Sequence, residues 1–320
     1  MEQQILISEI ATDTFRGLTA NSKYLLSKYF YDDAGSTIFQ DIMQMPEYYL
    51  TDCEFEIFTN NRKQITESFH KGVPGFDLIE LGSGDGLKTK ILLQYLLDNS
   101  VKFHYIPIDI SHKANVDLVN SLKNELPLLN VTAKTGDYFY EVKNLNGYSG
   151  LRKVFLFLGS NIGNFSDDEI DRFFSQLSIL CKEGDKLLIG FDLKKSPKVI
   201  MNAYSDPHGH TSRFNLNHLV RLNKELNANF STENFEHQAV YDPQTGAAKS
   251  FLVSKIKQSV YIADLEQHIH FEKWEPIFME LSRKFDLRTI KKIAEDHGFR
   301  VENQFTDNRD YFVNSLWVKE

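Results

Sequence analysis

A strand-like segment that breaks into alternating glycines constrains this chain more than any other feature. Segment 77–81 is apolar except for Asp77 and Glu80, which predicts a buried strand with an acid near its end. A helical pattern follows at 87–97. Between the two stand Gly82, Gly84 and Gly86. Strand, glycine turn and helix in this order predict the first turn of a nucleotide-binding βαβ unit.

The glycine spacing separates the candidate nucleotides. A dinucleotide fingerprint places its third glycine three positions after the second, to seat a pyrophosphate on the helix. Here the pattern is acid-x-Gly-x-Gly-x-Gly, which resembles motif I of the class I S-adenosylmethionine-dependent methyltransferases. A carboxylate at the strand end suits such a cationic ligand. An alternative is a glycine turn in an unrelated α/β protein, and a nicotinamide-dependent oxidoreductase is disfavoured by the spacing.

Composition excludes several classes of protein. The 320 residues are enough for two domains, and 42% hydrophobic with 25% charged residues is typical of globular proteins. A net charge of −8 argues against a nucleic-acid-binding face. No apolar run approaches the about 18 residues of a membrane span, and the start has no basic leader pattern. We therefore expect a cytoplasmic monomer that binds neither nucleic acid nor membrane.

The α/β alternation continues through strands expected at 103–109, 131–134, 154–158 and 186–191. Asp109 ends the second strand, 23 residues after Gly86, where an acid suits the ribose hydroxyls of a nucleoside. Asp137 and Tyr138 follow the third strand, where they are either adenine contacts or turn residues. Gly159 and Asn164 lie in the turn after the fourth, at the edge of the sheet where ligands bind.

Two segments do not fit this alternation. Residues 1–60 are aromatic and helical in pattern, with Ser36 expected to cap a helix, and 196–284 combines a helix at 216–226 with alternating strand patterns. We predict an α/β fold: a class I methyltransferase Rossmann-like, mostly parallel sheet with an antiparallel last strand, and a second α+β substrate domain. The expected domains are 61–195 plus 285–320 for S-adenosylmethionine, and 1–60 plus 196–284 for the substrate.

Four stretches together resemble the histidine-specific methyltransferases of ergothioneine biosynthesis. They are Tyr29–Ser36 with Pro46–Tyr49, the Glu80–Gly84 loop, Gly159–Asn164, and Ser212–Asn217 with Asn223–Leu226. The resemblance runs from about residue 20 to the C-terminus. It implies an enzyme that methylates the α-amino nitrogen of L-histidine three times, from S-adenosyl-L-methionine and without a metal, to give histidine betaine (hercynine) and S-adenosyl-L-homocysteine.

The resemblance also implies the site residues. Asn164 and Tyr204 match groups that hold the amino-acid backbone, and Glu280 and Ser282 match the pair that binds imidazole. Around the reacting amine stand Tyr31, Phe39 and Tyr48, with Gly159 nearby, and Tyr31 is the candidate proton relay. The expected cofactor-binding residues are Glu80, Gly82, Ser83, Gly84, Lys88, Asp109, Asp137 and Tyr138.

Phe251 departs from the family pattern. It stands at about the position of a pocket methionine in bacterial members, so a ring there would narrow or reshape the imidazole site. The same chemistry on a methylhistidine or an aromatic amino acid is therefore an alternative, and a non-catalytic S-adenosylmethionine-binding regulator is another. The loop Asp206–His210 carries two histidines but is interpreted as a solvated turn, and we predict no metal site.

Overall fold

The chain divides into two compact units. The computed structural model describes residues 8–145 and 150–320. The first unit comprises Met1–Tyr49 and Lys195–Arg283, and the second comprises Leu50–Lys194 and Lys284–Glu320. The chain passes from one unit to the other after residues 49, 194 and 283, and the last two of these boundaries lie within one residue of those expected from sequence. The first crossing lies at Tyr49, not at residue 60, because a single helix runs without interruption through that position.

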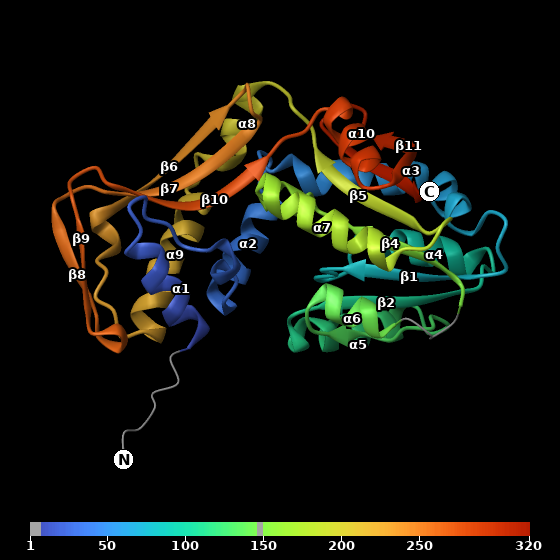
Figure 1. The fold of residues 1–320 in the computed structure, drawn as a ribbon, viewed down its shortest axis with the longest axis horizontal. Helices are drawn as coiled ribbons and strands as arrows, with labels where there is room; N and C mark the ends of the chain where they lie inside the picture. Colours follow the sequence, from blue (N-terminus) through green and yellow to red (C-terminus); the bar gives the residue numbers. More distant parts are fainter. Residues whose placement is uncertain (1–7, 146–149) are drawn as a thin grey trace, which may run out of the picture. The chain divides into compact units, whose positions relative to one another are not determined.

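The second unit is built on a seven-stranded sheet with the order β11-β12-β5-β4-β1-β2-β3 (Figure 1). Strands β1 to β5 pair in parallel, while β12 is antiparallel to both of its neighbours. This confirms the predicted mostly parallel sheet with an antiparallel last strand. The strands are β1 (Phe76–Leu81), β2 (Phe103–Asp109), β3 (Lys134–Thr135), β4 (Arg152–Phe157), β5 (Lys186–Asp192), β11 (Phe299–Thr306) and β12 (Phe312–Lys319).

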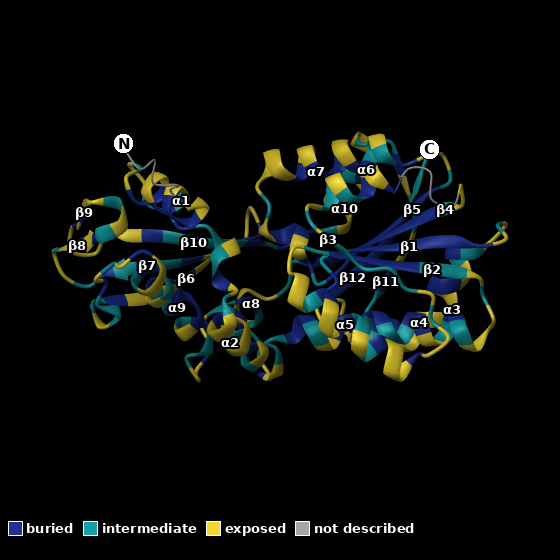
Figure 2. Ribbon diagram, turned by 90° about the horizontal axis from the view of Figure 1, so that it is seen from below, coloured by how far each residue is buried: buried dark blue, intermediate teal, exposed yellow. Residues whose placement is uncertain are grey.

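Helices cover both faces of this sheet. Figure 2 shows α6, α7 and α10 on one face and α3, α4 and α5 on the other. The side chains of β1 and β5 are buried throughout, as expected of parallel strands covered on both sides. The helices are α3 (Tyr49–His70), α4 (Thr89–Asp98), α5 (His112–Glu125), α6 (Tyr138–Asn144), α7 (Asp167–Leu180), α10 (Leu287–Asp296) and the 3-10 turn η2 (Asn161–Asn164).

The first unit is an α+β unit around its own core. A three-stranded antiparallel sheet, β10-β7-β6, packs against helices, and β8 and β9 form a separate hairpin (Figure 1). Its strands are β6 (Phe235–Asp242), β7 (Ala247–Ser254), β8 (Gln258–Ile262), β9 (Gln267–Phe271) and β10 (Pro276–Arg283). Its helices are α1 (Glu9–Leu18), η1 (Ser27–Phe30), α2 (Asp33–Gln44), α8 (Pro197–Tyr204), α9 (His210–Glu225), η3 (Thr232–Asn234) and η4 (Ala263–Leu265).

Carboxylates at two helix starts correct the sequence interpretation. Asp32, not Ser36, caps α2, because its side chain accepts the Gly35 N–H at 2.7 Å. Asp206 accepts three backbone N–H groups at the start of α9, including that of Thr211 at 2.8 Å. The helix expected at 216–226 therefore begins six residues earlier, and the Asp206–His210 loop is the cap of that helix.

Within the described residues, no helix is both long enough and apolar enough to cross a membrane.

A buried histidine lies in the first unit without polar partners. His218 of α9 is fully buried against the rings of Tyr29 and Phe30, and neither ring nitrogen has a hydrogen-bond partner within residues 8–145 and 150–320. Burial, reinforced by the positive charge of Arg221 and opposed by Asp32, lowers the pKa of His218 to about 3. The folded protein therefore holds this ring neutral where an unfolded chain would protonate it.

We predict that His218 makes the folded state sensitive to acid. Between pH 6.5 and 3 the unfolded chain binds a proton at this position and the folded chain does not, so stability falls as pH falls. The loss is about 2 kcal/mol at pH 5 relative to neutral pH. Urea unfolding from pH 5 to 7.5 measures it. His218→Leu should flatten the profile, whereas the exposed His270→Leu should not, and an unchanged slope in His218→Leu would refute the assignment.

Candidate active site

The glycine loop lies at the carboxyl end of β1 with its backbone in the left-handed region. The φ angles of Gly82, Gly84 and Gly86 are 75°, 53° and 63°, which glycine adopts at little cost. A Cβ on Gly82 would stand 2.9 Å from the Tyr138 hydroxyl, whereas a Cβ on Gly84 would meet open space. The loop therefore approaches Tyr138 closely on one side and leaves room for a ligand beside Gly84.

Glu80 braces this loop from inside the protein. It is almost fully buried, and its two carboxylate oxygens accept hydrogen bonds from the hydroxyls of Thr89 and Tyr105. Burial raises the pKa of Glu80 to about 7, against the lowering effect of those two hydrogen bonds. Both carboxylate oxygens of Glu80 are therefore bonded to neighbouring hydroxyls at the end of β1, and its contact with the cofactor stays a prediction.

Two further acids predicted for the cofactor lie beside the loop. Asp109 ends β2 and accepts the N–H groups of Ser111 at 2.9 Å and of Gly84 at 3.3 Å. Asp137 caps α6. Burial and then the charges of Asp109 and Asp137 raise the pKa of Tyr138 to about 12, which places the three side chains near one another. The structure therefore gathers Gly82, Gly84, Asp109, Asp137 and Tyr138 at one edge of the sheet.

These residues fit a nucleoside ligand. The Ser83 hydroxyl is buried and makes no hydrogen bond within the described part of the chain, so a polar partner from a ligand would satisfy it. Ile110, next to Asp109, is 83% exposed and offers an apolar face to a base. Acid, apolar face and open glycine turn are the groups that a ribose, a base and an amino-acid tail require.

A buried carboxylate joins the remaining loop residues. Glu54 of α3 is fully buried, forms an ion pair with Lys88, and accepts the Gly159 N–H at 3.0 Å. The Lys88 ammonium would stand 3.7 Å from a Cβ on Gly159. Sequence reasoning missed Glu54, although it lies between Cys53 and Ile57 on the buried stripe of a helix, where a charge is unusual.

The predicted imidazole-binding pair lies on β10 in the first unit. Glu280 and Ser282 are two residues apart on one strand, so their side chains share a face of the sheet. The Tyr204 hydroxyl, from α8, donates a hydrogen bond to the Ser282 oxygen at 2.6 Å. Three of the predicted substrate residues therefore come together above one face of the three-stranded sheet.

The strand register corrects the expectation for Phe251. Phe251 pairs with Phe278, whereas Ser250 pairs with Glu280 after a bulge in β10. Adjacent residues of a strand point to opposite faces, so Phe251 lies across the sheet from Glu280 and packs on Phe278 with a ring separation of 5.7 Å. The buried residue opposite Glu280 is Ser250. A shift of one residue accounts for the error.

Aromatic rings form the other part of the predicted substrate site. Tyr31 contacts Phe39 with ring centroids 5.4 Å apart, and Phe39 contacts Tyr48 at 6.1 Å. Phe214 of α9 joins both Tyr31 and Phe39, at 5.5 and 5.7 Å. Crowding around the phenol, then the charges of Glu280 and Tyr204, raise the pKa of Tyr31. Tyr31 is 48% exposed. Because its pKa is raised, its hydroxyl is protonated at neutral pH.

The predicted residues are thus divided between the two units. The aromatic and imidazole-binding residues belong to the first unit, while the cofactor residues, Gly159 and Asn164 belong to the second. Asn164 ends η2 and is exposed, and Ser160 begins this turn with a left-handed φ of 59°. Within each unit the structure brings most of the predicted residues together, but Phe251 lies on the other face of its sheet from Glu280.

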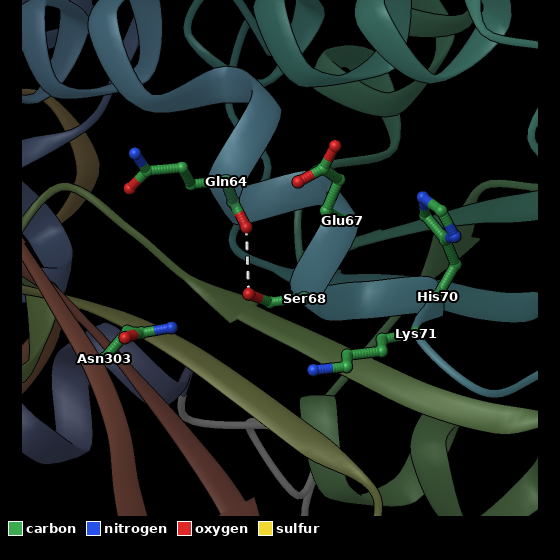
Figure 3. Close-up of a pocket in the computed structure, with 6 residues that line it drawn as sticks. All are labelled: Gln64, Glu67, Ser68, His70, Lys71 and Asn303. Carbon is green, nitrogen blue, oxygen red and sulfur yellow. Dashed lines mark hydrogen bonds between the residues drawn. The ribbon is translucent and has the colours of Figure 1, made fainter.

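A shallow hollow elsewhere on the second unit contains none of the predicted residues. Figure 3 shows it between the end of α3 and β11. Because the end of α3 comes directly before β1 in the chain, the hollow lies near the amino ends of the parallel strands, whereas the glycine loop lies at their carboxyl ends. The residues that line it are Gln64, Glu67, Ser68, His70, Lys71 and Asn303. Such a surface does not compete with the loop site as a place for chemistry.

Comparison with known proteins finds relatives over almost the whole chain. The family model described as "Histidine-specific methyltransferase, SAM-dependent" matches residues 10–319. The histidine N-alpha-methyltransferase of Mycolicibacterium smegmatis is 32% identical over 308 residues, covering 96% of this chain and 94% of the relative. The protein of that name from Mycobacterium tuberculosis is 30% identical over 307 residues, with the same coverage. Ergothioneine biosynthesis protein 1 of Schizosaccharomyces pombe is 26% identical over 291 residues, covering 88% of this chain and 37% of the relative.

The register predicts which neighbour of Glu280 affects substrate binding. Ser250→Phe should raise the KM for an amino-acid substrate at least tenfold, because the ring must occupy space beside Glu280. Phe251→Leu, on the opposite face, should change KM less than threefold. Steady-state kinetics measures both, and circular dichroism checks that each variant folds. The reverse order of effects would return Phe251 to the pocket.

Proposed function

Because the chain belongs to the family of histidine-specific, S-adenosylmethionine-dependent methyltransferases, we propose that it trimethylates the α-amino group of L-histidine. The product would be histidine betaine (hercynine), the methylated compound of ergothioneine biosynthesis. We further propose that the second unit binds the cofactor, that the first unit supplies most substrate contacts, and that the protein acts as a cytoplasmic monomer.

The observation that carries the substrate assignment is the polar set on β10. Imidazole has two nitrogens, one a donor and one an acceptor in the neutral ring. The Glu280 carboxylate accepts from the donor nitrogen, and the Ser282 hydroxyl, held by Tyr204 at 2.6 Å, donates to the other. An indole offers a single N–H and can make only one of these two hydrogen bonds, and a site of this kind discriminates against such a ligand.

The aromatic rings suit the successive forms of the amine. Each methylation removes an N–H donor and finally leaves a quaternary cation with no hydrogen to donate. Aromatic faces attract such a cation without hydrogen bonds. Tyr31, Phe39 and Tyr48 form a continuous edge-to-face group, so a cation placed against it meets several rings. The same residues therefore accommodate both the starting amine and the trimethylated product.

Tyr31 would govern the proton that leaves the amine. When bound, S-adenosylmethionine supplies an electrophilic methyl group on its sulfonium. At each transfer a nitrogen–carbon bond forms, the carbon–sulfur bond breaks, and the amine must first have lost one proton. The Tyr31 phenol, which stays neutral at neutral pH, would accept a hydrogen bond from the amine and orient its lone pair, and a bound water would take the proton that the amine loses. Alignment of the lone pair is the larger contribution that the protein makes.

Mass spectrometry of reactions with a panel of amino acids tests the function. The panel contains histidine, its two ring-methylated forms, tryptophan and tyrosine. We expect a three-methyl product from histidine alone, and Glu280→Gln should raise the histidine KM at least tenfold by weakening the bond to the imidazole N–H. Turnover of another amino acid instead of histidine would overturn the substrate. No product, with S-adenosylhomocysteine still bound, would favour a regulatory role.

Tyr31→Phe provides a separate test of the proton path. The ring is kept and the hydroxyl is lost, so cation–π contacts persist while proton removal slows. We expect each of the three methylations to slow at least tenfold, and partly methylated histidine to persist longer in quenched time courses. Tyr140→Phe, exposed on α6, is a matched control that should leave the time course unchanged. Identical time courses for wild type and Tyr31→Phe would exclude this role.

A further inference from the structure

Glu54 occupies a position that the proposed chemistry does not use. It lies in the second turn of α3, is fully buried, and has partners from three other parts of the second unit. Its carboxylate pairs with the Lys88 ammonium, accepts the Gly159 N–H at 3.0 Å, and accepts from the Asn314 side-chain amide at 2.8 Å. A carboxylate buried in this way is stable only while such partners are present.

The packing around Glu54 leaves it no room to move. A Cβ on Gly190 of β5 would stand 2.5 Å from a Glu54 oxygen, so a glycine is needed for the carboxylate to reach its place. Asn314 of β12 holds the same oxygen. One oxygen of Glu54 therefore lies against the neighbouring strands β5 and β12, and the other oxygen faces Lys88 and Gly159.

Lys88 is the more exposed partner of this ion pair. Its side chain is 23% exposed, so Lys88 is not fully enclosed although it is paired with Glu54. An ammonium has three donors, and Glu54 takes one direction. The nitrogen lies beside Gly159 and near Asn161, because a Cβ on Gly159 would be 3.7 Å from the lysine nitrogen and 3.8 Å from the Asn161 oxygen. The ammonium of Lys88, which follows the glycine loop at the start of α4, therefore lies beside the turn after β4.

We propose that Glu54 is a positioning residue that holds the Lys88 ammonium for the carboxylate of the cofactor's amino-acid tail. This inference rests on the proposed function only in taking S-adenosylmethionine as the ligand. Lys88 then forms a chain of alternating charge: buried carboxylate, ammonium, ligand carboxylate. Without Glu54 the flexible Lys88 side chain would have many rotamers. Ordering that side chain on binding would then make the binding free energy of the ligand less favourable.

Calorimetric binding of two ligands tests the proposal without catalysis. S-adenosylhomocysteine carries the amino-acid tail, and 5′-methylthioadenosine lacks it. Glu54→Gln should weaken S-adenosylhomocysteine at least tenfold and change methylthioadenosine less than twofold. Glu67→Gln, an exposed glutamate on the same helix, is the matched control and should affect neither ligand. A merely structural role for Glu54 would weaken both ligands together, and that result would overturn the proposal.

Lys88→Met keeps the test decisive if Glu54→Gln does not fold. It should reproduce the selective loss of S-adenosylhomocysteine, and in the double variant Glu54→Gln should add no further selective loss. An unchanged affinity of Lys88→Met for S-adenosylhomocysteine would refute the proposal. The binding of both ligands is measured separately from histidine turnover. If histidine proved not to be the substrate, the binding test of Glu54 would still be valid. If histidine turnover were intact but the binding results were not as predicted, the proposal for Glu54 would still fail.

Discussion

The buried Glu54 carboxylate is the interaction on which the carboxyl edge of the large sheet depends. It connects α3 with the end of β4 through Gly159, with β12 through Asn314, and with the start of α4 through Lys88. A charge without these partners would be costly to bury, so each segment is fixed by the presence of the others. The glycine loop and the turn after β4 therefore keep a defined spacing before any ligand binds, which lowers the entropy that binding must offset.

The division of labour between the two units follows from their different chemistry. Parallel strands covered on both faces bring loops to one edge, where positive-φ glycines open a turn for a nucleoside. The first unit instead has an antiparallel sheet with a polar pair on one strand and a group of rings packed on α9. Such a surface suits the small amine that we propose as the substrate.

The sequence predicted what depends on strong local patterns and failed where long-range pairing decides. Strand β2 has the predicted bounds, and the last strand of the sheet is antiparallel as predicted. The pocket neighbour on β7 was wrong by one residue because strand register depends on the bulge in β10, which no local pattern reveals. Glu54 was missed for a similar reason: its partners lie 34, 105 and 260 residues away. The Asp32 cap was missed because Asp33 and Ser36 offer competing local patterns.

The position and number of the transferred methyl groups test the central claim most directly. Carbon-13 NMR of histidine that has reacted with S-adenosylmethionine labelled in its methyl group locates each transferred carbon. The account predicts one signal from three equivalent methyl groups on the α-nitrogen, with the imidazole carbons unshifted apart from small neighbour effects. Methyl groups on a ring nitrogen, or a reaction that ends at one or two methyl groups, would contradict it.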